Sequence, residues 1–126
     1  MKNQTKRKKI KPTQPNEWFI MSRQPILVSD LKGLFDPQAD IEIWPELGVL
    51  EIVMGEKSSM DIEMIETDLG DEYSNAYLKE HQIQALFTAT FRPEDYDSAE
   101  PYLKTIAAGI DGIVCADTED FTPVVL

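Results

Sequence analysis

The chain contains one cysteine, Cys115, and one histidine, His81. A lone cysteine excludes a disulfide within the chain and zinc sites built on paired thiols, so nothing calls for an oxidising compartment. Catalytic dyads and triads of the Ser–His or Cys–His type would all need His81 as their base. Because His81 lies in the polar stretch "KEHQ" near the end of an expected helix, we interpret it as a solvated residue that favours the negative helix terminus.

Glycine-rich loops and long apolar runs are also missing. The six glycines are scattered as turn residues, so the sequence contains no phosphate-binding loop and predicts no cofactor. No apolar run approaches the roughly 18 to 20 residues that cross a bilayer, and no apolar stretch of signal-peptide type follows the basic N-terminus. We therefore expect a cytoplasmic protein that has no membrane partner.

Positive charge is scarce beyond the N-terminus. The chain has 12 Lys and Arg residues against 23 Asp and Glu residues, and six of these cations precede residue 12. Residues 12–126 hold the other six cations and all 23 acids, which is a net charge of −17. Residues 1–16 can bury too little apolar surface to offset their ordering entropy, so we interpret them as a basic disordered arm. Residues 17–126 are predicted to form a single acidic domain.

The basic arm has three interpretations. It could contact nucleic-acid phosphates or anionic lipid, fold back on its own acidic domain and shield it, or have no specific role. No aromatic residue is interleaved among the cations to stack on bases, and no acylation or amphipathic pattern is present. These absences favour a shielding or dispensable arm, and any nucleic-acid contact would be made through residues 1–11.

Alternating apolar and polar residues predict a mostly antiparallel sheet. In 60–66, Met60, Ile62 and Met64 alternate with acids, and the turn "PELG" suits a β-hairpin over 41–54. Short connections between these middle strands imply antiparallel neighbours. Further strands are expected at 17–23, 84–91 and 113–116, with an edge strand at 121–126.

Helical spacing is clearest over 97–112, where Ala99, Leu103 and Ile106 lie on one face. Asp97 or Ser98 is expected to cap this helix and Gly112 to end it. A shorter helix is expected over 70–83. Its predicted stripe consists of Tyr73, Ala76, Tyr77 and Glu80. One or two further helical turns are expected over 28–37. The candidate N-caps there are Ser29 and Asp30.

These elements predict an α+β two-layer sandwich. A mostly antiparallel sheet of five to six strands would carry the two main helices on one face. The best single topology is a ferredoxin-like or related split arrangement. Such a fold is a common scaffold, so the function has to be argued from particular residues.

The middle strands carry a patterned acidic face. If Leu50, Ile52 and Met54 point to the core, Glu51 lies on the opposite face. The same alternation places further acids beside it on the neighbouring strands. The predicted partner-binding residues are Glu42, Glu51, Asp61 and Glu63, with Trp44 as an anchor. Adjacent like charges destabilise a sheet, so this face would gain from a cationic partner. A solvated face that keeps the protein soluble is the alternative interpretation.

The acidic stretch 117–120 follows the apolar run that contains Cys115. Its weak candidate metal ligands are Asp117, Glu119 and Asp120. The spacing does not match a calcium-binding loop. We interpret Cys115 as a small buried hydrophobe, because neighbouring carboxylates would raise the pKa of its thiol.

The absence of catalytic machinery favours a non-enzymatic binding protein. Its acidic surface would engage a basic protein partner, as an inhibitor, an immunity factor or a DNA-mimicking regulator does. One alternative is a metal-dependent hydrolase built on carboxylates alone, with Asp95 or Asp97 across a cleft from the 117–120 acids. The other is an assembly module whose basic arm binds nucleic acid.

Overall fold

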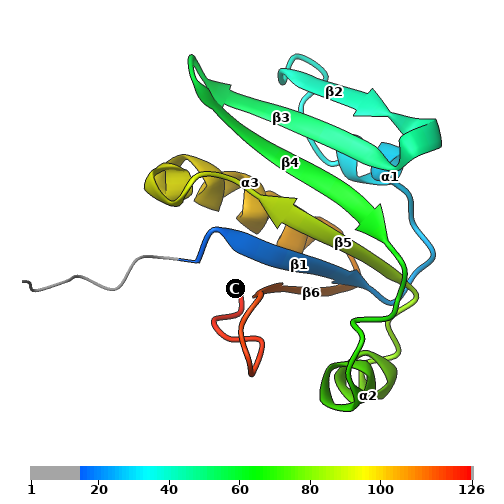
Figure 1. The fold of residues 1–126 in the computed structure, drawn as a ribbon. Helices are drawn as coiled ribbons and strands as arrows, with labels where there is room; N and C mark the ends of the chain where they lie inside the picture. Colours follow the sequence, from blue (N-terminus) through cyan, green and yellow to red (C-terminus); the bar gives the residue numbers. More distant parts are fainter. Residues whose placement is uncertain (1–14, 126) are drawn as a thin grey trace, which may run out of the picture.

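A computed structural model describes residues 15–125 of the chain (Figure 1). Six strands form one antiparallel sheet in the order β2-β3-β4-β5-β1-β6. The strands are β1 (Glu17–Ser22), β2 (Ile41–Trp44), β3 (Val49–Gly55), β4 (Ser58–Ile65), β5 (Ala85–Thr90) and β6 (Gly112–Ala116). The helices are α1 (Val28–Lys32), α2 (Glu72–Glu80) and α3 (Tyr96–Gly109), with 3-10 turns η1 (Pro45–Leu47) and η2 (Pro93–Asp95). The predicted α+β sandwich is confirmed.

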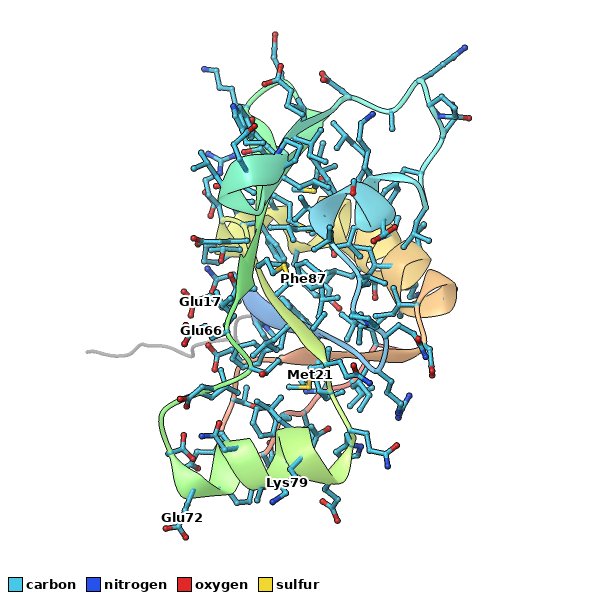
Figure 2. All side chains as sticks on the ribbon, turned by 90° about the vertical axis from the view of Figure 1, so that its right-hand side faces the viewer. Glu17, Met21, Glu66, Glu72, Lys79 and Phe87 are labelled. Atoms are coloured by element: carbon cyan, nitrogen blue, oxygen red, sulfur yellow. The ribbon has the colours of Figure 1, made fainter. Side chains whose placement is uncertain are left out.

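The larger core lies on one face of the sheet, beneath α1 and α3. Leu31 of α1 and Leu103 and Ile106 of α3 are fully buried there against the sheet. Figure 2 shows Phe87 of β5 on this side, whereas Met21 of β1 points toward α2. Successive side chains of a strand point to opposite faces, so the two residues identify two separate apolar layers.

Helix α2 packs on the second face, which corrects the expectation that both longer helices share one face. Its buried residue is Leu78, which packs with Met21 and Leu86 rather than with the larger core. The predicted stripe omitted Leu78, and Tyr73 is 60% exposed. Phe121, from the segment after β6, is buried beside α2 with its ring centroid 4.3 Å from that of Tyr77. The second layer therefore covers only the part of the sheet near β5, β1 and β6.

One split β-α-β unit is present. Strands β5 and β6 flank β1, are both antiparallel to it, and are connected through α3. Strands β2 to β5 follow one another as a meander instead of forming a second such unit. The order of the whole sheet therefore differs from a ferredoxin-like sheet, which contains two split units.

Both predicted helix starts are corrected. Helix α1 begins after Leu27, and the carboxylate of Asp30 accepts the Leu27 N–H at 2.8 Å from inside the first turn. Helix α3 begins directly after η2, and neither Asp97 nor Ser98 precedes it. Polar residues compatible with a cap occur at several neighbouring positions, so local composition does not decide which of them starts the helix.

Gly112 is part of β6 rather than the end of α3, which finishes at Gly109. It pairs with Ser22, and a Cβ at this position would overlap the carbonyl oxygen of Met21. The glycine is required because β1 and β6 approach too closely for a side chain.

The predicted edge strand at 121–126 is not found among the described residues. Phe121 has a positive φ of 60°, which interrupts an extended run because it lies in the left-handed region. The segment still covers the outer edge of β6: the Ala116 N–H donates to the Pro123 oxygen at 3.0 Å, and the Val125 N–H donates to the Val114 oxygen at 2.8 Å.

Candidate binding face

A transverse row of side chains crosses the second face of the sheet, where neither α1 nor α3 packs. Strand register aligns Glu42 with Glu51, and Glu51 with Asp61. The alignment continues from Asp61 to Thr90 and from Thr90 to Glu17. At the end of β6, the Asp117 N–H donates to the Glu17 oxygen at 2.9 Å. We call these six residues the acidic row: Glu42, Glu51, Asp61, Thr90, Glu17 and Asp117.

A second row lies next to the acidic row on the same face. Trp44 is aligned with Val49, Val49 with Glu63, and Glu63 with Thr88. Trp44 is 39% exposed, and Val49 is half-buried. The open face over β2, β3 and β4 therefore combines carboxylates with an exposed aromatic ring.

The register places all five predicted partner-binding residues on this one face. Glu42 and Trp44 come from β2, Glu51 from β3, and Asp61 and Glu63 from β4. The sequence argument missed Glu17 and Asp117. Glu17 alternates with the buried Trp18, so its face could have been inferred, but only the strand order shows that β1 continues the row of the middle strands.

Uncompensated negative charge is the main electrostatic property of the acidic row. Ion pairs between side chains of the described residues are made by Arg23, Arg92 and Lys104, and each of these cations pairs with an acid outside the row. Partial burial raises the pKa of Asp117, and the neighbouring charge of Glu17 adds to this increase. The row thus has acids that face one another without a cation of the described chain between them.

The candidate metal ligands Asp117, Glu119 and Asp120 are not assembled into a site. The Thr122 hydroxyl donates to Asp120 Oδ1 at 2.7 Å, and the Thr118 hydroxyl donates to the Thr122 oxygen at 2.8 Å. These hydrogen bonds close the loop on itself, and those from Thr122 lower the pKa of Asp120. Within residues 15–125, no three His, Cys, Asp or Glu side chains are grouped as a metal site would require.

Asp95, one of the two carboxylates predicted to lie across a cleft from the 117–120 acids, is hydrogen-bonded to Arg92 instead. Asp95 is nearly buried and accepts hydrogen bonds from Arg92, at 2.9 Å from Nε and 3.3 Å from the terminal nitrogen. The bidentate contact with Arg92 lowers the pKa of Asp95. Asp97 is exposed in the first turn of α3. The geometry therefore assigns Asp95 a structural role at η2.

Within residues 15–125, no hydrogen bond joins Cys115 to His81, the two residues that most resemble a nucleophile and a base. Cys115 is fully buried in the second layer, with its Sγ 4.0 Å from the sulfur of Met21. Burial raises the pKa of Cys115 to about 12, with a further contribution from Asp117. His81 follows the last residue of α2, and its ring packs at a tilt against that of Tyr77 with a centroid distance of 4.2 Å. A thiol with this pKa stays protonated near neutrality and is a poor nucleophile.

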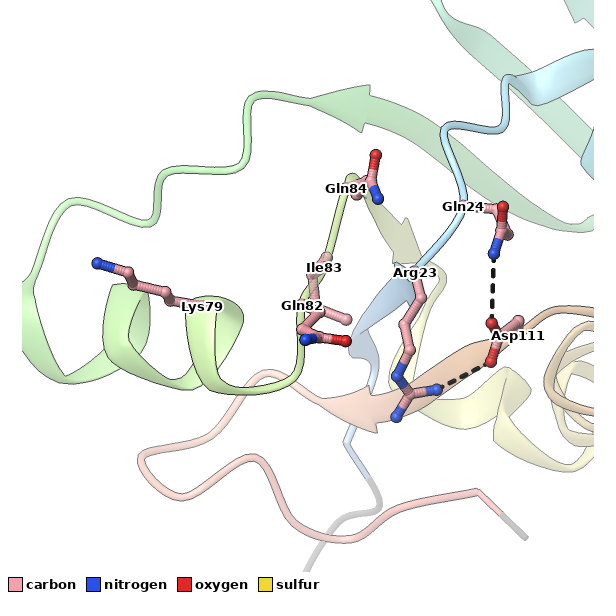
Figure 3. A pocket seen from close by; sticks show the side chains of 7 residues that line it. All are labelled: Arg23, Gln24, Lys79, Gln82, Ile83, Gln84 and Asp111. Carbon is pink, nitrogen blue, oxygen red and sulfur yellow. Dashed lines mark hydrogen bonds and ion pairs between the residues drawn. The ribbon is translucent and has the colours of Figure 1, made fainter.

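A polar depression of about 630 Å³ lies at the opposite end of β1 from Glu17 (Figure 3). Arg23 pairs there with Asp111 at 3.1 Å, and Gln24 contacts the same carboxylate at 3.5 Å. Lys79 and Gln82 of the α2 end complete much of its wall. The sequence argument did not predict this depression, because its residues come from three separate segments of the chain.

No helix in the described part of the chain combines the length and apolar character needed to cross a membrane. Comparisons of the chain with family models, curated proteins and solved structures gave no match.

Proposed function

We propose that the protein is a non-enzymatic binding protein that engages a basic protein surface through its open sheet face. The observation that carries this proposal is the acidic row, in which Glu42, Glu51 and Asp61 are directly aligned without a cation of residues 15–125 between them. The complementary charge would come from a basic protein, such as an enzyme targeted by an inhibitor, a nuclease or another nucleic-acid-binding protein.

The acidic row has a cost in stability that a partner would offset. Each directly opposed pair of like charges destabilises a sheet by about 0.2 to 1 kcal/mol. The alternation of β3 does not require an acid at Glu51, because any polar residue would keep that face solvated. Lys and Arg side chains of a partner would convert this repulsion into attraction and would raise the rate of association.

The size and composition of the face support a protein partner. From Glu17 to Glu42 the row crosses four strand spacings, or about 19 Å at about 4.8 Å per spacing. This width is suited to one side of a standard protein interface, which buries about 800 Å² per partner. Trp44, exposed next to the row, has the residue type that most often contributes strongly to binding energy.

A pull-down with matched variants tests the proposal. One variant removes three charges of the row by Glu42→Gln, Glu51→Gln and Asp61→Asn. The control removes three exposed charges elsewhere by Glu56→Gln, Glu80→Gln and Asp97→Asn. We expect the wild type and the control to retain the same basic proteins at low and moderate salt, and the row variant to lose them. Equal retention by all three chains, or none by any, would contradict the proposal.

A cytoplasmic location is part of this proposal. Cys115 is free and buried, which is consistent with a compartment in which thiols remain reduced.

A further inference from the structure

We propose that the polar depression beyond the end of β1 binds a small anion that carries one carboxylate or phosphate group and several hydroxyl groups. The depression begins at Arg23, directly after β1, whereas Glu17 of the acidic row is the first residue of that strand. This site is therefore separate from the acidic row, and its ligand is additional to the proposed protein partner. Its volume of about 630 Å³ lies within the range of small-molecule sites, about 300 to 1,000 Å³.

Hydrogen bonds between the three segments fix the wall of the depression (Figure 3). The Arg23 N–H donates to the Asp111 oxygen at 2.8 Å, which joins the end of β1 to the turn before β6. The Gln84 N–H donates to the Ser22 oxygen at 2.7 Å, which joins β1 to the residue preceding β5. The Arg23 guanidinium is held as well, by Asp111 Oδ1 at 3.1 Å. The site is thus largely formed before a ligand arrives, which reduces the entropic cost of binding.

Positive charge exceeds negative charge in the depression, in contrast to the domain as a whole. Residues 12–126 contain six Lys and Arg residues and have a net charge of −17. Two of these six, Arg23 and Lys79, line the depression, where Asp111 is the one acid among the described lining residues. A local excess of cations in an acidic domain favours an anionic ligand of low total charge.

Both cations have donors to offer. Within residues 15–125, Lys79 makes no ion pair. The hydrogen bond from Arg23 to Asp111 uses one terminal nitrogen, and no other described residue accepts from the rest of the guanidinium. A guanidinium with uncommitted donors is suited to the oxygens of a carboxylate or a phosphate, and an ammonium group adds a point charge.

Three glutamine side chains supply most of the remaining polar surface. Gln24 contacts Asp111 at 3.5 Å, whereas the side-chain amides of Gln82 and Gln84 make no hydrogen bond to another residue of the described chain. An amide group both donates and accepts hydrogen bonds, as a hydroxyl group does. Hydroxyl groups beside the anionic group of the ligand would therefore satisfy these amides, and the mostly polar wall disfavours an apolar ligand.

Gln82 has a backbone conformation in which glycine is the usual residue. Its φ of 57° lies in the left-handed region, directly after His81 at the end of α2, where glycine avoids the strain caused by a Cβ. The Gln82 N–H donates to the Lys79 oxygen and the Ile83 N–H to the Leu78 oxygen, each at 3.0 Å. Glycine would keep both bonds. A strained side chain that lines a depression and bonds to no described residue is typical of a ligand contact.

NMR titration of the full isotope-labelled chain at moderate salt tests the site with three probes. Gluconate carries a carboxylate, glucose 6-phosphate carries a phosphate, and sorbitol carries hydroxyl groups alone. We expect one or both anions to shift the side-chain amide signals of Gln24, Gln82 and Gln84 with a Kd of about 1 mM or lower. Sorbitol should leave them unchanged. A response to gluconate alone identifies a carboxylate ligand, and a response to glucose 6-phosphate alone identifies a phosphate ligand.

Three results would overturn the proposal. They are no saturable shift with either anion, an equal response to sorbitol, and shifts that are spread over the surface or confined to the basic arm.

Matched variants separate ligand contact from folding. Gln82→Gly removes the amide and suits the backbone, so its Tm should not fall, whereas its Kd should rise by about threefold or more. Lys79→Gln should raise the Kd by about tenfold, because a hydrogen bond to a charged group is lost. Lys32→Gln, which removes an exposed cation of α1, is the control and should bind as the wild type does. Unchanged affinity in both Gln82→Gly and Lys79→Gln would also overturn the proposal.

The outcome is independent of the test of the proposed function. None of these variants changes the acidic row, so a failure of the small-anion site would leave retention of basic proteins by the row unaffected. A failure of the pull-down would likewise leave the small-anion site standing.

Discussion

Replacing the central carboxylate of the acidic row should stabilise the protein. Glu51 is aligned with Glu42 on one side and with Asp61 on the other. Glu51→Gln keeps the length of the side chain and removes both repulsions. At about 0.2 to 1 kcal/mol for each opposed pair, the expected gain is about 0.4 to 2 kcal/mol in the free energy of unfolding. For a domain of this size, 1 kcal/mol corresponds to an increase of about 4 °C in Tm.

Urea denaturation at two salt concentrations measures this gain. Salt screens exposed charges, with a Debye length that falls from roughly 20 Å at about 20 mM salt to about 4 Å at about 500 mM salt. We expect the full gain at low salt and a clearly smaller gain at high salt. Glu56→Gln, in the exposed turn between β3 and β4, is the control and should change stability by less than about 0.5 kcal/mol.

A double-mutant cycle makes the test specific to the row. Glu42→Gln and Glu51→Gln remove the same repulsion, so their combined gain should be smaller than the sum of the two separate gains. A loss of stability in Glu51→Gln, or a gain independent of salt, would refute the view that the row is self-repelling.

Three further predictions concern the fold around the row. Gly112→Ala should cost about 3 kcal/mol or more, because the added Cβ overlaps the backbone of β1. Gly55→Ala should be tolerated in the same urea experiment, because its added Cβ would make only an ordinary contact with Ser58 Cβ at 3.9 Å. Cys115 should resist alkylation in the native protein at pH 8 and react once unfolded; because its native pKa is raised from about 9.0 to about 12, stability should fall as the pH rises through this range, and Cys115→Ala should lose this alkaline dependence. The lowered pKa of Asp95 contributes stability above its ordinary value of 3.8 and loses it as the pH falls further, so Arg92→Gln should be less stable than the wild type at pH 7, with a smaller difference near pH 3 in thermal unfolding.

Local patterns predicted much of the fold. The alternation of Met60, Ile62 and Met64 placed β4 correctly, and the apolar spacing of Leu103 and Ile106 identified the buried side of α3. These predictions succeeded because a strand has a period of two residues and a helix a period of 3.6, so burial on one side leaves a trace in the sequence. The same alternation predicted that Glu42, Glu51, Asp61 and Glu63 would share a face.

Other features depended on contacts between distant segments. In α2 the buried residue is Leu78, whereas Tyr73 is exposed. Leu78 is buried because α2 packs it against Met21 and Leu86 on the second face of the sheet. The segment after β6 forms a loop instead of a strand, because Phe121 has a positive φ and its ring packs against Tyr77. Such choices depend on which apolar surface remains uncovered, and a short stretch of sequence does not contain that information.

The net charge of this protein, and the face on which each strand carries its acids, can be read from the amino-acid sequence. The position of β1 between β5 and β6 is known only from the folded chain, and this position makes Glu17 and Asp117 extend the row begun by Glu42, Glu51 and Asp61. The difference arises because side-chain alternation is a property of one strand, whereas the order of strands follows from backbone pairing and burial between segments far apart in the chain.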